Sequence, residues 1–304
     1  MPLRVTPGMM HMQLTRNLNR NMTQMQGLSE QVTTGRKINR ASDDPVGITY
    51  ALRYRSELSS NEQYQKNVDS ALSWLDFNDT VLSQSTDVLK RVKELAVQGS
   101  NGTNPQVALD NIRDEVVQLK DQMLDIANSK LNGKYVFNGQ KFNEKPYDPA
   151  AGTPPFNPAA VQTDTGQINY SVGVGVTLPV NVTGAEAFGN PGDPDNVFTV
   201  LDNLMAALAS GNYDAVSGEI TNIESRMDKI LNSQSEIGAR VNRVELMQNR
   251  LKDLEINLTD LKSKVEDADF EQLLIDSKIN ENIYQASLSV GAKVITPSLV
   301  DFLR

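Results

Sequence analysis

The sequence contains no cysteine and only one histidine, His11, among its 304 residues. The lack of cysteine excludes disulfides, thiolate zinc sites, iron–sulfur clusters and cysteine nucleophiles. A single histidine excludes two-histidine metal sites and, away from the N-terminus, a Ser-His-Asp triad. We therefore expect that the protein is not an enzyme and that it has no cofactor and no metal site.

Long apolar runs are also missing. No stretch of about 18 uninterrupted apolar residues occurs, so we expect no transmembrane helix. The first residues, MPLRVTPGMMH, contain no apolar run of the kind that signal peptides carry. Export from the cell would therefore need a route that does not use a cleaved signal.

Basic residues are absent from one long segment. Between Pro146 and Ser225 there is no lysine or arginine, and the nine acidic residues there equal the whole net charge of −9. Such a segment repels nucleic acid and anionic membranes, although an acidic surface can also serve solubility alone. Eight of the 13 prolines lie between Pro146 and Pro194. We expect an irregular or β-containing insert here, and neither nucleic acid nor membrane as a partner.

Helical periodicity dominates the N-terminal part of the chain. A first amphipathic helix is predicted to end near Gly35, a residue type favoured just after a helix. Asp44 and Pro45 are typical of the cap and first position of a second helix, which we expect to run to about Gln98. A third helix is predicted between Pro105 and Leu131. The apolar stripe of the first helix consists of Leu14, Leu18, Met22, Met25, Leu28 and Val32.

The C-terminal part carries the longest periodic pattern. Apolar residues follow steps of three and four from Ile220 to Ala268, which predicts a long coiled-coil helix over about 217–265. Gly238 interrupts it at a cost of about 1 kcal/mol relative to alanine, so we expect close packing or a bend there. A further helix is predicted before Pro297, and its stripe consists of Ile279, Ile283, Ala286, Val290 and Val294.

Two β patterns lie in the middle of the chain. Asn138-Gly139 between Tyr135–Phe137 and Gln140–Phe142 predicts a hairpin with a type I′ turn. Every even position from Ile168 to Val182 is apolar, a period that suits a strand. Glycines and a proline within this stretch indicate bends or an edge strand.

The polar clusters are weighed against simpler explanations. Asp43-Asp44 could bind a cation, and the residues around Arg36 could hold a phosphate, but a helix cap and a solvated or partner-facing charge are favoured. His11 with its neighbouring methionines could bind a soft metal, but an unbranched apolar cluster on an interaction helix is favoured. The sequence DPDN at 193–196 is typical of a turn and cap rather than a calcium loop.

These patterns predict a mainly α protein with a β-containing insert. The N-terminal and C-terminal arms form an elongated helical bundle or coiled coil, and the central domain is Gly/Pro-rich and β-containing. The two ends can share one stalk only if they lie together. Because isolated helices are marginal in water, the two terminal stripes are expected to need partners.

Three segments resemble the bacterial flagellin family. TGRKINRASDDPVG at 34–47 is similar to the N-terminal signature S-G-x-R-I-N-x-A-x-D-D-P-A-G, and VEDADF at 265–270 to the C-terminal signature I-E-D-A-D-Y/F. PSLVDFLR at 297–304 resembles the closing V-L-x-L-L-R. Within the family, Met9-Met10 and GKYVFNG at 133–139 are more similar to the hook–filament junction proteins than to flagellins.

The resemblance implies a secreted axial component of the flagellum, exported unfolded by the flagellar type III route. Expected partners are further copies of the chain in a ring, flagellin, a neighbouring hook-associated protein, and a cytoplasmic export chaperone on the C-terminal helix. The implied domains are terminal axial helices at 1–42 and 266–304, core segments at 43–132 and 217–265, and an outward-facing, β-rich variable domain at 133–216. The expected assembly or chaperone interface consists of Leu14, Leu18, Met22, Met25, Ile283, Val290, Val294, Leu299 and Leu303.

Two alternatives remain open for the function. A short flagellin that forms the filament itself would share the terminal signatures and the helical arms. A coiled-coil adaptor outside the flagellum would share the apolar periodicity but would not need those signatures. An enzyme is disfavoured further, because a glycosidase built on carboxylates alone would need a shaped cleft that the sequence does not indicate.

Overall fold

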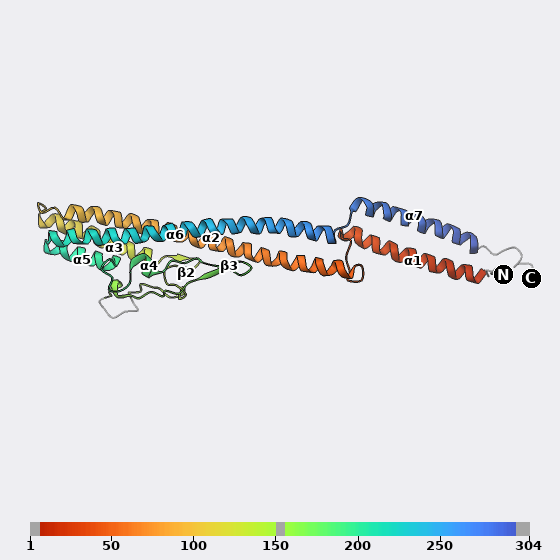
Figure 1. The fold of residues 1–304 in the computed structure, drawn as a ribbon, viewed down its shortest axis with the longest axis horizontal. Coiled ribbons are helices and arrows are strands. Elements are labelled where there is room, and N and C mark those ends of the chain that lie inside the picture. The colour runs from red at the N-terminus through yellow and green to blue at the C-terminus, as the bar shows by residue number, and fades with distance from the viewer. Residues whose placement is uncertain (1–6, 150–155, 296–304) are drawn as a thin grey trace, which may run out of the picture. The chain divides into compact units, whose positions relative to one another are not determined.

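The computed structural model describes residues 7–149 and 156–295, and its described part is mainly helical (Figure 1). The predicted class, a mainly α protein with a small β-containing insert, is confirmed. No helix in the described ranges is long and apolar enough to cross a membrane. The helices are α1 (Pro7–Thr34), α2 (Pro45–Gly99), α3 (Gln106–Ala127), α4 (Gly184–Phe188), α5 (Val197–Ser210), α6 (Tyr213–Glu266) and α7 (Phe270–Ile295).

The chain divides into two compact units, and α2 and α6 each contribute to both. The unit of residues 61–252 contains a helical bundle in which α2 and α6 run antiparallel. The side-chain amide of Asn61 donates to the carbonyl of Leu251 (3.0 Å), and that of Gln248 donates to Asp69 (2.9 Å). The stripes predicted for these helices supply its core, because one apolar face per helix must be removed from water. Its largest buried aliphatic side chains are Leu75, Leu82, Leu89, Leu109, Met123, Leu201, Leu204 and Leu208.

The insert is anchored to this bundle by an aromatic cluster. Phe137, Tyr147, Phe188 and Phe198 are all buried, with ring centroids 5.0–6.1 Å apart in tilted or edge-on pairs. Phe198 lies on α5, which packs on α3. The predicted cap at the start of α5 is confirmed, since the side-chain oxygen Oδ1 of Asn196 accepts from the backbone amides of Phe198 and Thr199.

Within residues 7–149 and 156–295, the strands form two small antiparallel sheets, and one hairpin differs from the prediction. The turn falls at Asn132-Gly133, between β1 (Lys130–Leu131) and β2 (Lys134–Tyr135), with φ of 50° and 81°. The predicted turn at Asn138-Gly139 was wrong. The side-chain amide of Asn138 instead donates to the backbone carbonyls of Lys141 and Glu144 and closes a wider loop. Helix α3 consequently ends at Ala127, before the predicted end at Leu131.

The alternating segment folds back on itself as a second hairpin. Strand β3 (Asn169–Gly173) pairs with β4 (Val176–Pro179), and Gly175 adopts a φ of 70° at the turn. The predicted bends within this stretch are confirmed. The short 3-10 helix η1 (Pro158–Ala160) precedes the hairpin and contacts α5.

Gly238 is not closely packed, which was one of the two explanations that its sequence context offered. It lies inside continuous α6, its backbone is exposed, and a Cβ placed there would meet nothing within 4 Å. Close packing was therefore the wrong explanation for this glycine, which sits at an open position of the helix surface.

The second unit comprises residues 1–60 and 253–304 and contains α1, α7, the first part of α2 and the last part of α6. Helices α1 and α7 pack side by side along their length (Figure 1). The two helices run antiparallel: Gly291, near the end of α7, lies against Leu14, near the start of α1, and a Cβ on Gly291 would lie 2.8 Å from the Leu14 side chain. Asn21, two turns after Leu14, donates to Ser287, one turn before Gly291, at 3.5 Å.

Candidate functional site

The two signature segments meet around one carboxylate. Glu266, the last residue of α6, has a fully buried side chain and pairs with Arg36 (2.7 Å) and with Arg55 on α2. The hydrogen bond from the Arg55 guanidinium to Glu266 raises the pKa of Arg55. A buried carboxylate is stable only when it is paired and hydrogen-bonded. Glu266 thus joins the end of α6 to the loop after α1, through Arg36, and to α2, through Arg55.

Backbone hydrogen bonds reinforce this joint. The Lys37 amide donates to the carbonyl of Glu266 (2.7 Å), and the Ala268 amide donates to the carbonyl of Gly35 (3.0 Å). Gly35 has a φ of +69°, a conformation that favours glycine and ends α1 as predicted. The two connections therefore pair as a short antiparallel ladder that fixes where the terminal helices leave α2 and α6.

The loop 35–44 is closed by the two adjacent aspartates. Asp43 accepts from the amides of Asn39 and Arg40, and these backbone hydrogen bonds lower the pKa of Asp43. Asp44 accepts from the amides of Val46 and Gly47, so the predicted N-cap of α2 is confirmed. A Cβ on Gly47 would lie 2.5 Å from the Asp44 carboxylate, which explains the glycine. Both acidic side chains are thus used to shape the chain.

The seam between α1 and α7, meaning the residues that each helix turns toward the other, is apolar on α1 but mostly polar or small on α7. On α1 the half-buried positions at heptad spacing are mostly apolar, and Glu30 and Gln31 near its end are half-buried as well. The heptad-spaced positions are Leu14, Leu18, Asn21, Met25, Leu28 and Val32. On α7 the corresponding positions are mostly polar or small: Leu273, Ser277, Asn280, Tyr284, Ser287 and Gly291. Small residues let the backbones approach closely, but this seam removes little apolar surface of α7 from water.

The apolar stripe of α7 faces away from this seam. At 100° per residue, its centre lies about 100° around the helix from the seam positions. Ile279, Ile283 and Val290 are 49%, 45% and 58% exposed. An exposed apolar stripe of this length is typical of a surface that another protein covers.

The predicted interface residues thus fall into three groups. Leu14, Leu18 and Met25 lie in the seam between α1 and α7, while Met22, Ile283 and Val290 are exposed. The side chains of Val294, Leu299 and Leu303 lie outside the described residues. The roles of Glu266, Arg36 and Arg55 were not predicted, and the one signal in the sequence was that Glu266 and Arg36 lie within the family signatures.

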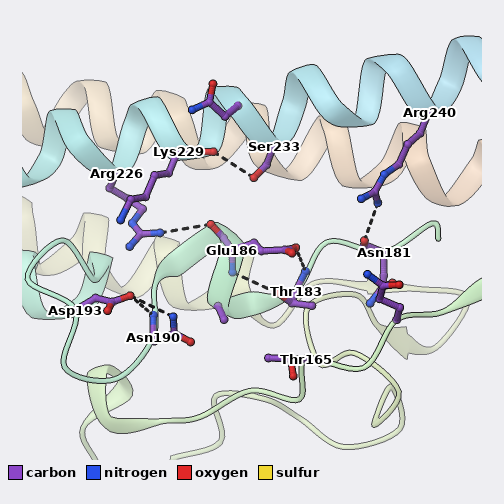
Figure 2. A pocket seen from close by; sticks show the side chains of 13 residues that line it. Thr165, Asn181, Thr183, Glu186, Asn190, Asp193, Arg226, Lys229, Ser233 and Arg240 are labelled. Atoms are coloured by element: carbon purple, nitrogen blue, oxygen red, sulfur yellow. Dashed lines mark hydrogen bonds between the residues drawn. The ribbon is translucent and has the colours of Figure 1, made fainter.

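A second arrangement of charged groups lies in the other unit, where α6 faces the insert (Figure 2). Arg226 is buried, donates to the carbonyls of Asp195 (2.8 Å) and Glu186 (3.4 Å), and lies 2.9 Å from the Asp195 carboxylate. Burial would raise the pKa of Asp195, but Lys229 and Arg226 together lower it. Arg240 donates to the carbonyls of Pro179 and Asn181.

Arg226, Lys229 and Arg240 line an open pocket of about 510 Å³, and each of these three cations already has an acidic partner. Arg226 and Lys229 pair with Asp195, and Arg240 pairs with Glu236. Within the described ranges, no group of three or more histidine or acidic side chains could hold a metal ion. The contacts of Arg226 and Arg240 therefore fasten the insert to α6.

Acidic residues of the segment 146–225, which contains no lysine or arginine, form ion pairs with lysines on neighbouring helices. Asp202 on α5 pairs with Lys120 on α3, and Glu224 pairs with Lys93 on α2. Together with the ion pairs of Asp195, these contacts neutralise part of the negative charge of the segment. The segment is thus less strongly repelling than its formal charge alone suggests.

Comparison with known proteins agrees with the two signature segments. The model of the bacterial flagellin N-terminal helical region matches residues 5–142, and that of the C-terminal helical region matches residues 220–303. The chain belongs to the bacterial flagellin family. It is a structural protein of the bacterial flagellum.

Relatives match this flagellin-family chain over almost its whole length. The flagellar filament 30.7 kDa core protein of Treponema maltophilum is 25% identical over 292 residues, 96% of each chain. Flagellar hook-associated protein 3 of Escherichia coli is 24% identical over 94% of this chain and 95% of its own. A hook-associated protein of Vibrio parahaemolyticus shares the fold, with a TM-score of 0.66 at 23% identity over 74% of this chain and 100% of its own.

Proposed function

We propose that this chain is the junction subunit that joins the hook of the bacterial flagellum, through another hook-associated protein, to the flagellin filament. Support comes from a relative named flagellar hook-associated protein 3 that matches 94% of this chain. The segments around Met9 and Gly133–Gly139, which resemble junction proteins, support it further.

Assembly through the terminal helices is carried by the exposed stripe of α7. Complete burial of one isoleucine or valine stabilises a contact by about 1.5–3 kcal/mol. Because Ile279, Ile283 and Val290 are about half exposed in the single chain, covering them adds about 1 kcal/mol each. A row of such residues is enough to hold a neighbouring chain when it repeats around a ring.

In this proposal, residues 1–42 and 266–304 are the axial helices of the inner layer. Residues 43–132 and 217–265 form the core around them, and 133–216 is the outward-facing domain. The ring consists of further copies of the chain, with flagellin on one side and a neighbouring hook-associated protein on the other.

The chain reaches this place through the flagellar type III route as an unfolded polypeptide. The absence of cysteine suits such a route, because no thiol can trap the threaded chain. Before export, a cytoplasmic chaperone covers the stripe of α7, with Ile283 and Val290 among its contacts.

A short flagellin is the second candidate. It is favoured by the Treponema relative, which is named a filament core protein and is as similar as the hook-associated protein. Both candidates predict assembly through the same helices, so the position of the chain along the flagellum separates them.

Immunogold electron microscopy of detached flagella, with antibody raised against residues 146–216, makes this separation. Label confined to a narrow band between hook and filament is expected for the junction subunit. Label along the whole filament would establish the flagellin alternative, and absence of label from flagella would refute both.

The role of the stripe is tested by Val290→Asp, which places a charge in the proposed contact. We expect the variant to be absent from flagella, as judged by immunoblot of sheared and washed filaments. Gln285→Asp adds the same charge on an exposed position outside both the stripe and the seam, and it should be incorporated normally. Normal incorporation of Val290→Asp would contradict assembly through this face.

A further inference from the structure

Exposed methionine is concentrated on a single helix. Met9, Met10, Met12 and Met22 on α1 are 56%, 44%, 61% and 43% exposed. Every other methionine with a described side chain is less accessible. These are Met25, Met205, Met227 and Met247, which are partly buried, and Met123, which is fully buried. The free chain thus presents its accessible thioethers together in the axial helix.

The four side chains differ in their position relative to the helix pair. Met9 and Met12 are one turn apart and lie on the side of α1 away from the seam that holds Leu14 and Leu18. Met10 is on the seam side, one turn before Leu14, and Met22 lies beside the seam. Oxidation at Met9 and Met12 therefore leaves the packing between α1 and α7 in place.

We propose that these four methionines are a modification site for peroxide-class oxidants, and that their oxidation blocks incorporation of the free chain. The second part rests on the proposed function. The thioether sulfur attacks one oxygen of hydrogen peroxide, the O–O bond breaks, and water leaves. The sulfur loses two electrons and becomes a sulfoxide, while the peroxide is reduced to water.

The consequence follows from the polarity of the product. A thioether is flexible and apolar and fills irregular contacts between helices. A sulfoxide carries a strong hydrogen-bond acceptor, and burying an acceptor without a donor opposes the contact. Several sulfoxides on one helix act together, so an oxidised chain is excluded while a chain already in place keeps these sulfurs covered.

The site is tested on the purified full-length chain with hydrogen peroxide. Peptide mass spectrometry over time should show sulfoxide at Met9, Met10, Met12 and Met22 forming about ten times faster than at Met123. Met25 is the internal comparison on the same helix and should react more slowly than Met22. Equal rates at all sites, or faster reaction at Met123, would overturn the assignment.

The consequence is tested by adding treated chain to cells that lack their own copy. The matched variant replaces the four exposed methionines by leucine, which keeps an apolar side chain without sulfur. Peroxide should lower incorporation of the native chain about tenfold or more and leave the leucine variant unchanged, and methionine sulfoxide reductases should restore the native chain. Equal incorporation of oxidised and untreated native chain would overturn the block. If the untreated chain is also excluded, the mass map alone decides the modification site, and the immunogold label on detached flagella decides the proposed function.

Discussion

Replacing Glu266 by glutamine tests whether the joint between the signature segments depends on its buried charge. The substitution keeps the shape but removes the carboxylate that Arg36 and Arg55 share. Removing one partner of a fully buried ion pair costs about 3–5 kcal/mol. Here the two arginine side chains are 46% and 38% exposed and can be rehydrated, so we expect about 2 kcal/mol.

This loss is local, so the assay must be local. Amide hydrogen exchange reports the free energy of opening at each segment. A loss of about 2 kcal/mol corresponds to about 30-fold faster exchange. We expect this acceleration at Lys37 and Ala268, whose amides bond across the joint.

A matched control removes a surface ion pair one and a half turns earlier on α6. Asp260→Asn breaks the exposed contact with Lys264, which contributes at most a few tenths of a kcal/mol. Exchange at the joint should be unchanged in this variant. Unchanged exchange in Glu266→Gln would refute the argument that the carboxylate holds the segments together.

Two further predictions concern the stability of the rest of the chain. Gly238→Ala should raise the free energy of unfolding by about 0.5–1 kcal/mol, because the position is open and helical. Gly47→Ala should instead destabilise, because its Cβ would meet the Asp44 cap, and urea denaturation of both variants checks the contrast. The pKa of Asp195 is lower in the folded than in the unfolded chain, so its ion pairs stabilise above about pH 4 and lose this effect as pH falls through the folded pKa. Asp195→Asn should therefore be less stable than the native chain at pH 7, with a difference that shrinks in acid; a difference independent of pH would contradict the ion-pair explanation.

Several features followed from the sequence alone because their causes are local. The stripes of α2, α3 and α6 repeat every three or four residues, and such a period both predicts a helix and selects its buried face. The end of α1 at Gly35 and the caps Asp44 and Asn196 depend on residues within one turn. The two signature segments identified the family for the same reason, since each is a short continuous stretch.

Other features were decided only by tertiary contacts. Two Asn-Gly pairs, at 132–133 and 138–139, satisfy the local requirement of the same tight turn equally well. The tight turn forms at 132–133, because the side chain of Asn138 donates instead to the carbonyls of Lys141 and Glu144. The meeting of Glu266 with Arg55 joins residues 211 positions apart, and no local pattern specifies such a partner.

The direction of the α7 stripe is the clearest case of this difference. Periodicity predicted that Ile279, Ile283 and Val290 share one face, but it could not say which neighbour that face meets. In the single chain, α1 packs against the polar and small residues of α7, and Leu14 packs directly against Gly291. The apolar face is left outward because one partner helix covers only one side of another. The sequence determined that the stripe exists, and the tertiary structure determined that it remains exposed.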